Sequence, residues 1–332
     1  GDLFDNLTSN SLMNYGILFY SISSVSYLFF TIIMLYKILQ SVNSHIDFKF
    51  IFLFIFGSGV PYFAFERYSM SHVFEIFTIT LIIYFSHFFY KGNERSNFYA
   101  FCIPISILLA ILVRWVNYYA FLIPYITFLI FKEAHKKNYE LRNNLFFYIG
   151  SILSLFIFSY LSKSIYGVIT FNPQFVYGTS GMLKSYINTS ESFQYFIINN
   201  FKNFINILFT KEFGIFWFSP IIFFAVLFII YNLLFKNKDK FLYFLLSISF
   251  AQIFTTVLIW QSTASSYGFR YLFNLVPLSI LIFYYYTKTK QIQLINLYLY
   301  VFSIIGILSL FFFETTEMTQ LSTVNEVNSF GR

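Results

Sequence analysis

The sequence predicts an all-α fold, a polytopic helical membrane protein with about ten transmembrane helices and an external interfacial helix. Three observations lead to this fold class. Of the 332 residues, 58% are hydrophobic and only 11% are charged, whereas soluble domains carry about 25% charged residues. Phe, Tyr and Trp make up 25% of the chain, more apolar surface than a soluble globule of this size could bury. The apolar residues also gather in runs close to the roughly 20 residues that cross a bilayer as a helix. The composition excludes a disordered chain, a disulfide scaffold and a soluble nucleic-acid binder.

Ten apolar runs are candidates for membrane-spanning helices. The second run is interrupted by Gly57, Gly59 and Pro61, and the fourth and fifth runs are separated only by Arg114, so those two could form one kinked element. The predicted spans are residues 15–39, 50–65, 72–90, 98–113, 115–131, 145–162, 214–235, 241–260, 271–287 and 293–313.

The basic residues are distributed unequally between the gaps. Alternate gaps hold most of the 21 Lys and Arg residues, while the other gaps hold single arginines and a few lysines. The positive-inside rule therefore places the first set in the cytoplasm and the second outside. The net charge of +7 is read as membrane orientation and not as a nucleic-acid surface. The cytoplasmic set is Lys37, Lys49, Lys91, Arg95, Lys132, Lys136, Lys137, Arg142, Lys236, Lys238, Lys240, Lys288 and Lys290.

The longest segment outside the predicted membrane is residues 163–213. Its second half repeats apolar residues at helical spacing from Phe193 to Leu208, with Asn and Lys residues on the other face. This pattern predicts an amphipathic helix lying in the interface plane. An ordinary packing helix is the alternative.

The first polar cluster runs from Glu66 to His72, with Glu75 one turn further along the chain. If the third span begins here, His72 and Glu75 lie on the same helix face. Ionisable groups at membrane depth usually pair or line a cavity. A His with a carboxylate can perform acid–base chemistry or hold a divalent cation, which is the one cofactor that the sequence leaves open. The alternative is an interfacial ion pair of Glu66 with Arg67 or Arg114.

Two further clusters on the external side each contain a solitary arginine. Arg114 stands between two spans beside Trp115, and Arg270 ends a small polar loop that contains Trp260 and Tyr267. A guanidinium cannot lose its charge and binds phosphate or carboxylate bidentately. A phosphate-bearing lipid head group is therefore an expected partner, and a snorkelling anchor is the alternative.

These clusters together resemble a known family. The chain is similar to multispan glycosyltransferases of the GT-C type, the polyprenyl-phosphate-sugar-dependent enzymes related to protein mannosyltransferases and lipid A aminoarabinose transferases. The resemblance runs from about residue 14 to 287, and Arg114-Trp115 departs from the Arg-Pro usual in the family. The matching motifs are Pro61-Tyr62, Ser69-Met70-Ser71-His72, Leu112-Val113-Arg114 with Asn117, Gly214 with Ser219-Pro220, and Trp260 with Tyr267-Gly268-Phe269-Arg270.

The resemblance implies a glycosyltransferase of the hexosyltransferase class. Such an enzyme moves a sugar with inversion from a polyprenyl-phosphate carrier to a glycan, lipid or protein acceptor on the external face. It implies Arg270 and Arg114 as phosphate partners and His72 as a residue that lines the site. The catalytic base of the family is a carboxylate in the first external loop, which we expect upstream of Gly1. Within the chain the candidates for this base are Asp2, Asp5 and Glu66, and the substrate-binding candidates are Arg270, Arg114, His72, Glu75, Arg67, Tyr267 and Trp260.

The domain organisation follows from the same resemblance. We expect residues 1–14 to be the remnant of the first external loop, 15–313 the GT-C-like transmembrane domain and 314–332 an external tail. Ten crossings place both termini outside, so we expect a fragment that lacks its first helix. The expected location is a bacterial inner membrane, with the site facing the periplasm or the exterior.

Two other function classes stay open at this point. A transporter or flippase of lipid-linked glycans would use the same arginines to hold phosphate without chemistry. A glycan polymerase or ligase is a third possibility, although such proteins usually centre on arginines in a large external loop and segment 163–213 contains none. An Asp or Glu in the loop before Gly1 would favour the enzyme over the transporter.

Overall fold

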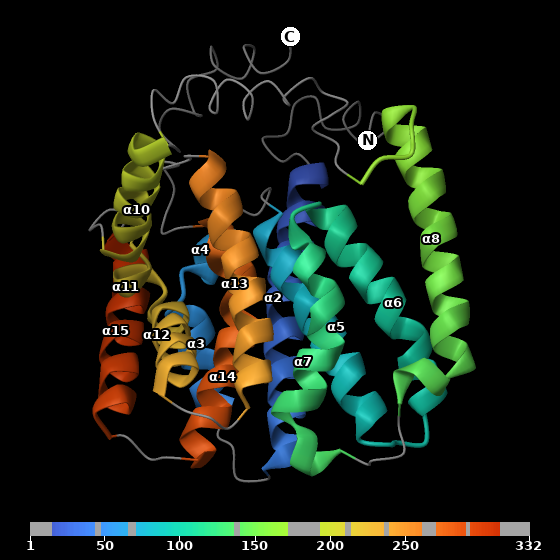
Figure 1. Ribbon diagram of the computed structural model, residues 1–332, viewed down its shortest axis with the longest axis horizontal. Coiled ribbons are helices and arrows are strands. Elements are labelled where there is room, and N and C mark those ends of the chain that lie inside the picture. Colours follow the sequence, from blue (N-terminus) through green and yellow to red (C-terminus); the bar gives the residue numbers. More distant parts are fainter. Residues whose placement is uncertain are drawn as a thin grey trace.

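The chain folds into helices that stand side by side in one bundle (Figure 1). The computed structural model describes residues 15–43, 48–65, 71–135, 140–171, 193–209, 214–235, 239–260, 270–289 and 293–312, and these residues contain helices and no strand. The predicted all-α fold class is therefore confirmed for this part of the chain.

Four helices are long and apolar enough to cross a membrane among the described residues. They are the larger part of α2 (Tyr15–Val42) and the whole of α5 (His72–Tyr90), α6 (Ser96–Val113) and α8 (Leu145–Tyr166). The prediction of about ten spans is wrong for the described chain, because the other apolar helical stretches described there, such as Lys240–Thr255 and Leu297–Leu308, are 10–17 residues long. Several apolar runs thus gave the position of a helix but were divided into shorter elements, as for residues 50–65 and 115–131.

Glycine and proline explain two of the interruptions. The second apolar run is split into α3 (Phe48–Phe56) and α4 (Val60–Phe65), and Gly59 between them has a φ of 76°, a conformation that glycine adopts without steric cost. The fifth run is split into the 3-10 helix η1 (Asn117–Leu122) and α7 (Ile123–Ile130), which has Pro124 in its first turn. Proline lacks an N–H donor and is tolerated there but not in a helix interior.

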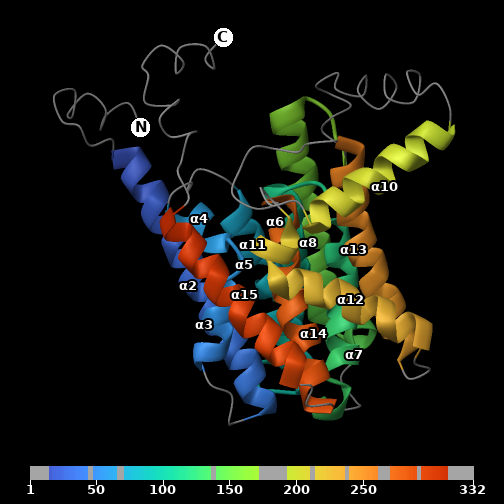
Figure 2. The same cartoon turned by 90° about the vertical axis from the view of Figure 1, so that its left-hand side faces the viewer.

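The C-terminal half adds further helices beside these four (Figure 2). The apolar run expected at 271–287 begins with a 3-10 helix before its α-helix. The elements are α10 (Phe193–Phe209), α11 (Ile215–Phe218), α12 (Pro220–Phe235), α13 (Lys240–Trp260), η5 (Arg270–Leu275), α14 (Val276–Thr289) and α15 (Gln293–Phe312), and the short 3-10 helices η2 (Lys132–Ala134) and η3 (Leu141–Asn143) join α7 to α8.

Helix α10 is the amphipathic helix predicted in segment 163–213, and its helical state is confirmed. It lies obliquely across the upper end of the bundle (Figure 2). Ile207 and Leu208 are buried, and the ring of Phe204 lies 5.4 Å from that of Phe254 in α13. Phe201 is 65% exposed. The helix therefore packs on the bundle along one side and presents an aromatic residue to its surroundings.

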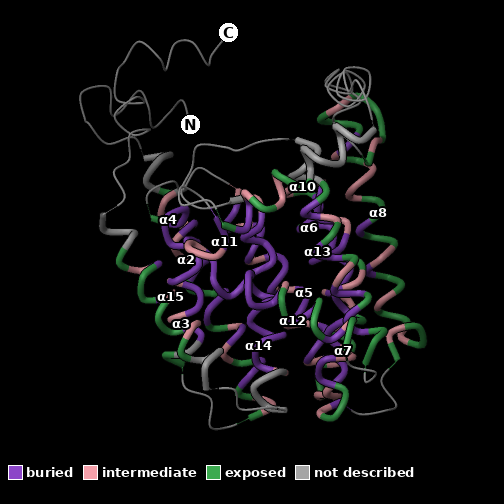
Figure 3. Tube along the Cα trace, turned by 60° about the vertical axis from the view of Figure 1, so that its left-hand side comes forward, coloured by how far each residue is buried: buried purple, intermediate pink, exposed green. Residues whose placement is uncertain are grey.

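The core lies between the central helices, and α8 stands at the periphery (Figure 3). Ile152, Phe156 and Tyr160 of α8 are each about two-thirds exposed (69%, 70% and 68%). An apolar helix that buries little of its surface fits a lipid environment better than water, because exposed apolar patches of this extent are rare on soluble monomers.

The two ends of the bundle differ in charge. Helices α2, α5 and α7 end, and α6 and α8 begin, at the lower end in Figure 1. The gaps that join them there carry Lys91, Arg95, Lys132 and Arg142. We call this the basic end and the other the opposite end. These basic gaps, which alternate with less basic ones along the sequence, thus lie at one end of the described bundle.

Helices α3 and α15 approach closely enough for their backbones to touch. A Cβ atom added to Gly306 would lie 2.6 Å from the carbonyl oxygen of Gly57, and one added to Gly57 would lie 2.6 Å from Cα of Ser303. Small residues permit such close helix packing in membrane proteins.

Gly306→Ala is expected to destabilise the protein by about 1–3 kcal/mol, because the new methyl group must push the two helices apart. Ile304→Ala is the matched control on the same helix, since Ile304 is 49% exposed, and it should cost less than about 0.5 kcal/mol. Thermal unfolding of the purified chain in detergent measures both. Equal melting temperatures for the two variants would contradict the backbone contact.

Candidate functional site

A buried polar network lies at the opposite end, where α5 begins and α6 ends. It joins four elements that are far apart in sequence: α5, the residue that follows α6, η1 and η5. Its members are His72, Glu75, Arg114, Asn117 and Asn274.

Helix α5 supplies the acidic centre of the network. The helix begins at His72, so the prediction that His72 and Glu75 share a face is confirmed: Nδ1 of His72 lies 3.6 Å from Oε2 of Glu75. Glu75 is fully buried (0% exposed) in the first turn of the helix. A carboxylate is favoured there by the partial positive charge of the helix N-terminus.

Arg114 supplies the countercharge. Helix α6 ends at Val113 and Arg114 has extended backbone angles (φ −152°, ψ 121°), so the two apolar runs are separate elements and not one kinked helix. Nη1 of Arg114 donates to Oε2 of Glu75 at 3.2 Å, and the guanidinium lies 5.0 Å from the ring centre of Tyr271. The sequence predicted an ion pair of Arg114 with Glu66 as one alternative, and the structure pairs it with Glu75.

Two asparagines complete the network. Nδ2 of Asn274 donates to Oε1 of Glu75 and to Oδ1 of Asn117, both at 3.0 Å. Nδ2 of Asn117 donates to the carbonyl of Ala110 in the last turn of α6 (3.0 Å), and the hydroxyl of Tyr119 donates to the carbonyl of Asn274 (3.3 Å). Sequence analysis did not single out Asn274 or Tyr119. An Asn near the start of the apolar run 271–287 was the available signal.

The network holds Glu75 as a paired, inaccessible carboxylate. Both of its oxygens accept hydrogen bonds and no part of it reaches solvent, so in this arrangement it positions its neighbours and cannot act as a base on a substrate. Arg114 keeps spare donors, because its Nε and Nη2 have no partner within the described part of the chain. His72 is buried, with the rings of Phe63 and Tyr271 5.1 and 6.0 Å from its own.

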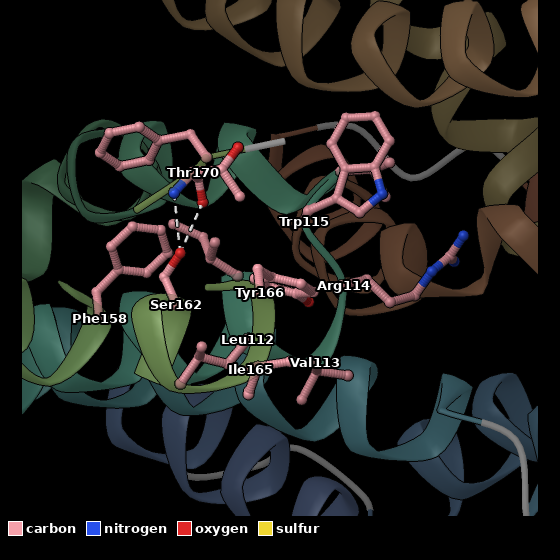
Figure 4. Close-up of a pocket in the computed structure, with 12 residues that line it drawn as sticks. Leu112, Val113, Arg114, Trp115, Phe158, Ser162, Ile165, Tyr166 and Thr170 are labelled. Atoms are coloured by element: carbon pink, nitrogen blue, oxygen red, sulfur yellow. Dashed lines mark hydrogen bonds between the residues drawn. The ribbon is translucent and has the colours of Figure 1, made fainter. Parts of the chain in front are cut away.

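A pocket of about 260 Å³ opens beside Arg114, between the ends of α6 and α8 (Figure 4). Ser162 and Thr170 are hydrogen-bonded on one side of it, and the guanidinium of Arg114 extends away from them. The walls are mainly apolar and aromatic: Ile111, Leu112, Val113, Trp115, Val116, Phe158, Ile165, Tyr166 and Phe171. The pocket thus combines an apolar wall with one arginine at its edge.

Several predicted site residues cannot be placed in this geometry. The backbone of Arg270 begins η5, next to the network, and Trp260 ends α13, but the side chains of both lie outside what the structure describes. Asp2, Asp5, Glu66, Arg67 and Tyr267 lie outside the described residues altogether. Among the residues searched, no group of three or more His, Cys, Asp or Glu side chains could hold a metal, so the divalent cation left open by the sequence has no ligand set there.

A second polar cluster, missed by sequence analysis, lies at the basic end. Oγ of Ser41 is 2.6 Å from Nε2 of His87, and Nδ1 of His87 is 3.2 Å from Nε2 of His135. Nζ of Lys91 donates to the carbonyl of Ser41 at 2.9 Å. The chain of contacts ties α2 to α5 and to the segment after α7. Its signal in the sequence was His87 within an otherwise apolar run.

The fold and the network define a class: the described part of the chain is all-helical, with four helices that could cross a membrane and a buried ion pair at the less basic end. Comparison with protein-family models, with curated proteins and with solved structures finds no match for this chain. The function is therefore argued from the site itself.

Glu75→Gln and Arg114→Gln are each expected to destabilise the protein by about 3–5 kcal/mol, because each leaves a buried charge without its partner. The double variant should lose clearly less than the sum of the two. Glu140→Gln is the control, since it removes an exposed ion pair with Arg142 that is worth about 0–1 kcal/mol. Denaturant unfolding in mixed micelles measures the set, and strict additivity of the two changes would show that the groups are not coupled.

His135 makes the stability of the basic end depend on pH. Burial beside Phe128 and Tyr90 lowers the pKa of His135 from 6.5 to about 4. Between these values the unfolded chain binds a proton that the folded chain excludes, so stability is complete above pH 6.5 and falls as the pH drops toward 4. His135→Gln should flatten this dependence of the melting temperature. An unchanged pH profile in the variant would contradict it.

Proposed function

We propose that this chain is an integral-membrane glycosyltransferase that moves a sugar from a polyprenyl-phosphate carrier to an acceptor at the opposite end of the bundle. The observation that carries the proposal is the buried network, which joins Asn274 of η5 to α5 and to the end of α6. Through Asn274 it holds the backbone that begins with Arg270 close to Arg114. Two arginines from distant parts of the sequence are thereby brought to one end of the protein.

The chemistry of the carrier requires such an arrangement. A phosphate that leaves a sugar develops negative charge, and fixed cations that already face it stabilise that charge without reorganisation. Arg114 is fixed by Glu75 and by the ring of Tyr271. The pocket beside it has aromatic walls that include Trp115 and Tyr166, and aromatic faces are suited to sugar rings and to isoprenoid chains.

The orientation follows from charge. The basic end would face the cytoplasm and the opposite end would face the periplasm or exterior of a bacterial inner membrane. The carrier would enter from the bilayer, and the glycan, lipid or protein acceptor from the aqueous side. The catalytic base of this proposal lies outside the described residues, because Glu75, the carboxylate that they contribute at this end, is fully paired.

The full pairing of Glu75 favours a second candidate function. A transporter or flippase of lipid-linked glycans needs a phosphate site but no base. Glu75 is bonded to Arg114 and Asn274, so the described network is complete without a reacting carboxylate. The two candidates differ in whether the bond between sugar and phosphate is broken.

Transfer of labelled sugar from a polyprenyl-phosphate sugar tests the proposal in membranes that contain the full chain. Arg270→Gln is expected to lower transfer by about 100-fold or more, the scale seen when an oxyanion-stabilising donor is removed, and Arg270→Lys should keep part of it. Arg95→Gln is the control, an exposed arginine of the basic end. Equal rates in Arg270→Gln and wild type would contradict the site. Movement of intact carrier across proteoliposomes without sugar release would favour the transporter.

A further inference from the structure

A second, mainly apolar groove is lined by residues from η1 and α7 to the segment before α8. Its volume is about 570 Å³, within the range of small-molecule sites. It runs along α7 from Phe121 in η1 to the Glu140–Arg142 segment at the basic end. The residues that line it are Tyr90, Ile107, Phe121, Pro124, Tyr125, Phe128, Glu140, Leu141, Arg142 and Phe147.

The groove has a buried floor and an exposed rim. Tyr90, Ile107 and Pro124 on the floor are buried, whereas Phe121 and Tyr125 on the rim are 62% and 46% exposed. The rim therefore faces outward from the bundle. In a membrane, an outward-facing apolar groove that runs parallel to the helices meets acyl chains and not water.

The mouth of the groove carries one positive and one negative charge. Nε of Arg142 donates to Oε2 of Glu140 at 2.6 Å, and Nδ2 of Asn143 donates to the same oxygen at 3.1 Å. Both ionic side chains reach solvent (Arg142 79% and Glu140 44% exposed). The two terminal nitrogens of Arg142 have no partner within the described chain, and neither does Oε1 of Glu140.

The floor of the groove is held in place by the histidine cluster behind it. The rings of Tyr90 and Phe128 lie 5.3 and 5.8 Å from that of His135, which contacts His87. His87 in turn contacts Ser41 of α2. Contacts with α2, α5 and the segment after α7 thus support this side of the groove.

We propose that this groove binds a zwitterionic phospholipid with an ammonium head group, one acyl chain lying along α7 and the head group at the Glu140–Arg142 pair. The free N–H groups of Arg142 are donors for the phosphate, and the free carboxylate oxygen of Glu140 is an acceptor for the ammonium. The charge pattern selects against an anionic lipid without an ammonium group, because the Glu140–Arg142 pair has no net charge and the free oxygen of Glu140 would face the lipid's negative charge without an ammonium group.

Native mass spectrometry of the purified full chain tests this, with phosphatidylethanolamine and phosphatidylglycerol offered in equal amounts. The wild-type chain should retain phosphatidylethanolamine in preference. Arg142→Gln should lower that retention by about threefold, the scale of an exposed ion pair, and Leu141→Trp should lower it by filling the groove. Glu140→Gln should shift the preference toward phosphatidylglycerol.

Two control variants separate a site from general lipid adhesion. Lys132→Gln removes an exposed charge at the same end, and Ile152→Trp adds an indole to the exposed face of α8. Both should retain lipid as the wild type does, and melting temperatures establish that every variant is folded. Equal retention in all variants, equal loss in Lys132→Gln and Arg142→Gln, or a wild-type preference for phosphatidylglycerol would each overturn the proposal.

Discussion

The ion pair between Glu75 and Arg114 is the interaction on which the arrangement of the opposite end depends. Glu75 is fully buried and Arg114 nearly so, with side-chain exposures of 1% and 14%. An unpaired buried charge costs several kcal/mol. The folded state therefore requires that Glu75 and Arg114 pair with each other. Glu75 is in the first turn of α5 and Arg114 follows α6. Their ion pair therefore places the start of α5 beside the end of α6. Asn274 extends the same constraint to η5.

Much of the architecture was predictable because it depends on local pattern. The starts of α5, α6 and α8, the break at Arg114 and the helix within segment 163–213 all follow from apolar spacing and from charge, Gly and Pro. Helix length was not predictable in the same way. In the run 271–287 the α-helix begins only at Val276, and Pro277 in its first turn marks that start. The sequence does not show that the residues before it form a 3-10 helix whose Asn274 bonds to Glu75, 199 residues away.

The candidate site, too, was predictable where it depends on local spacing and not where it depends on long-range contacts. His72 and Glu75 are three residues apart, so their shared face could be read from the sequence. The partners of Glu75 are 39 and 199 residues away, and no local pattern selects Arg114 or Asn274 from among the other polar residues. The histidine contacts at the basic end were missed for the same reason, since His87 and His135 are 48 residues apart. Buried polar pairs that are far apart in sequence can be identified only once the packing of the helices is known.

The pairing also decides how the opposite end can hold an anion. Glu75 and Arg114 together carry no net charge, so a phosphate placed beside Arg114 alone would bring an uncompensated negative charge close to a buried carboxylate. Coulomb repulsion at that range is poorly screened away from water. The proposed function therefore calls for a second cation, and Arg270 is the candidate, because Asn274 ties the helix that begins at Arg270 to Glu75. Arg114 balances Glu75 in this arrangement, and under the proposed function Arg270 would supply the net positive charge for a phosphate.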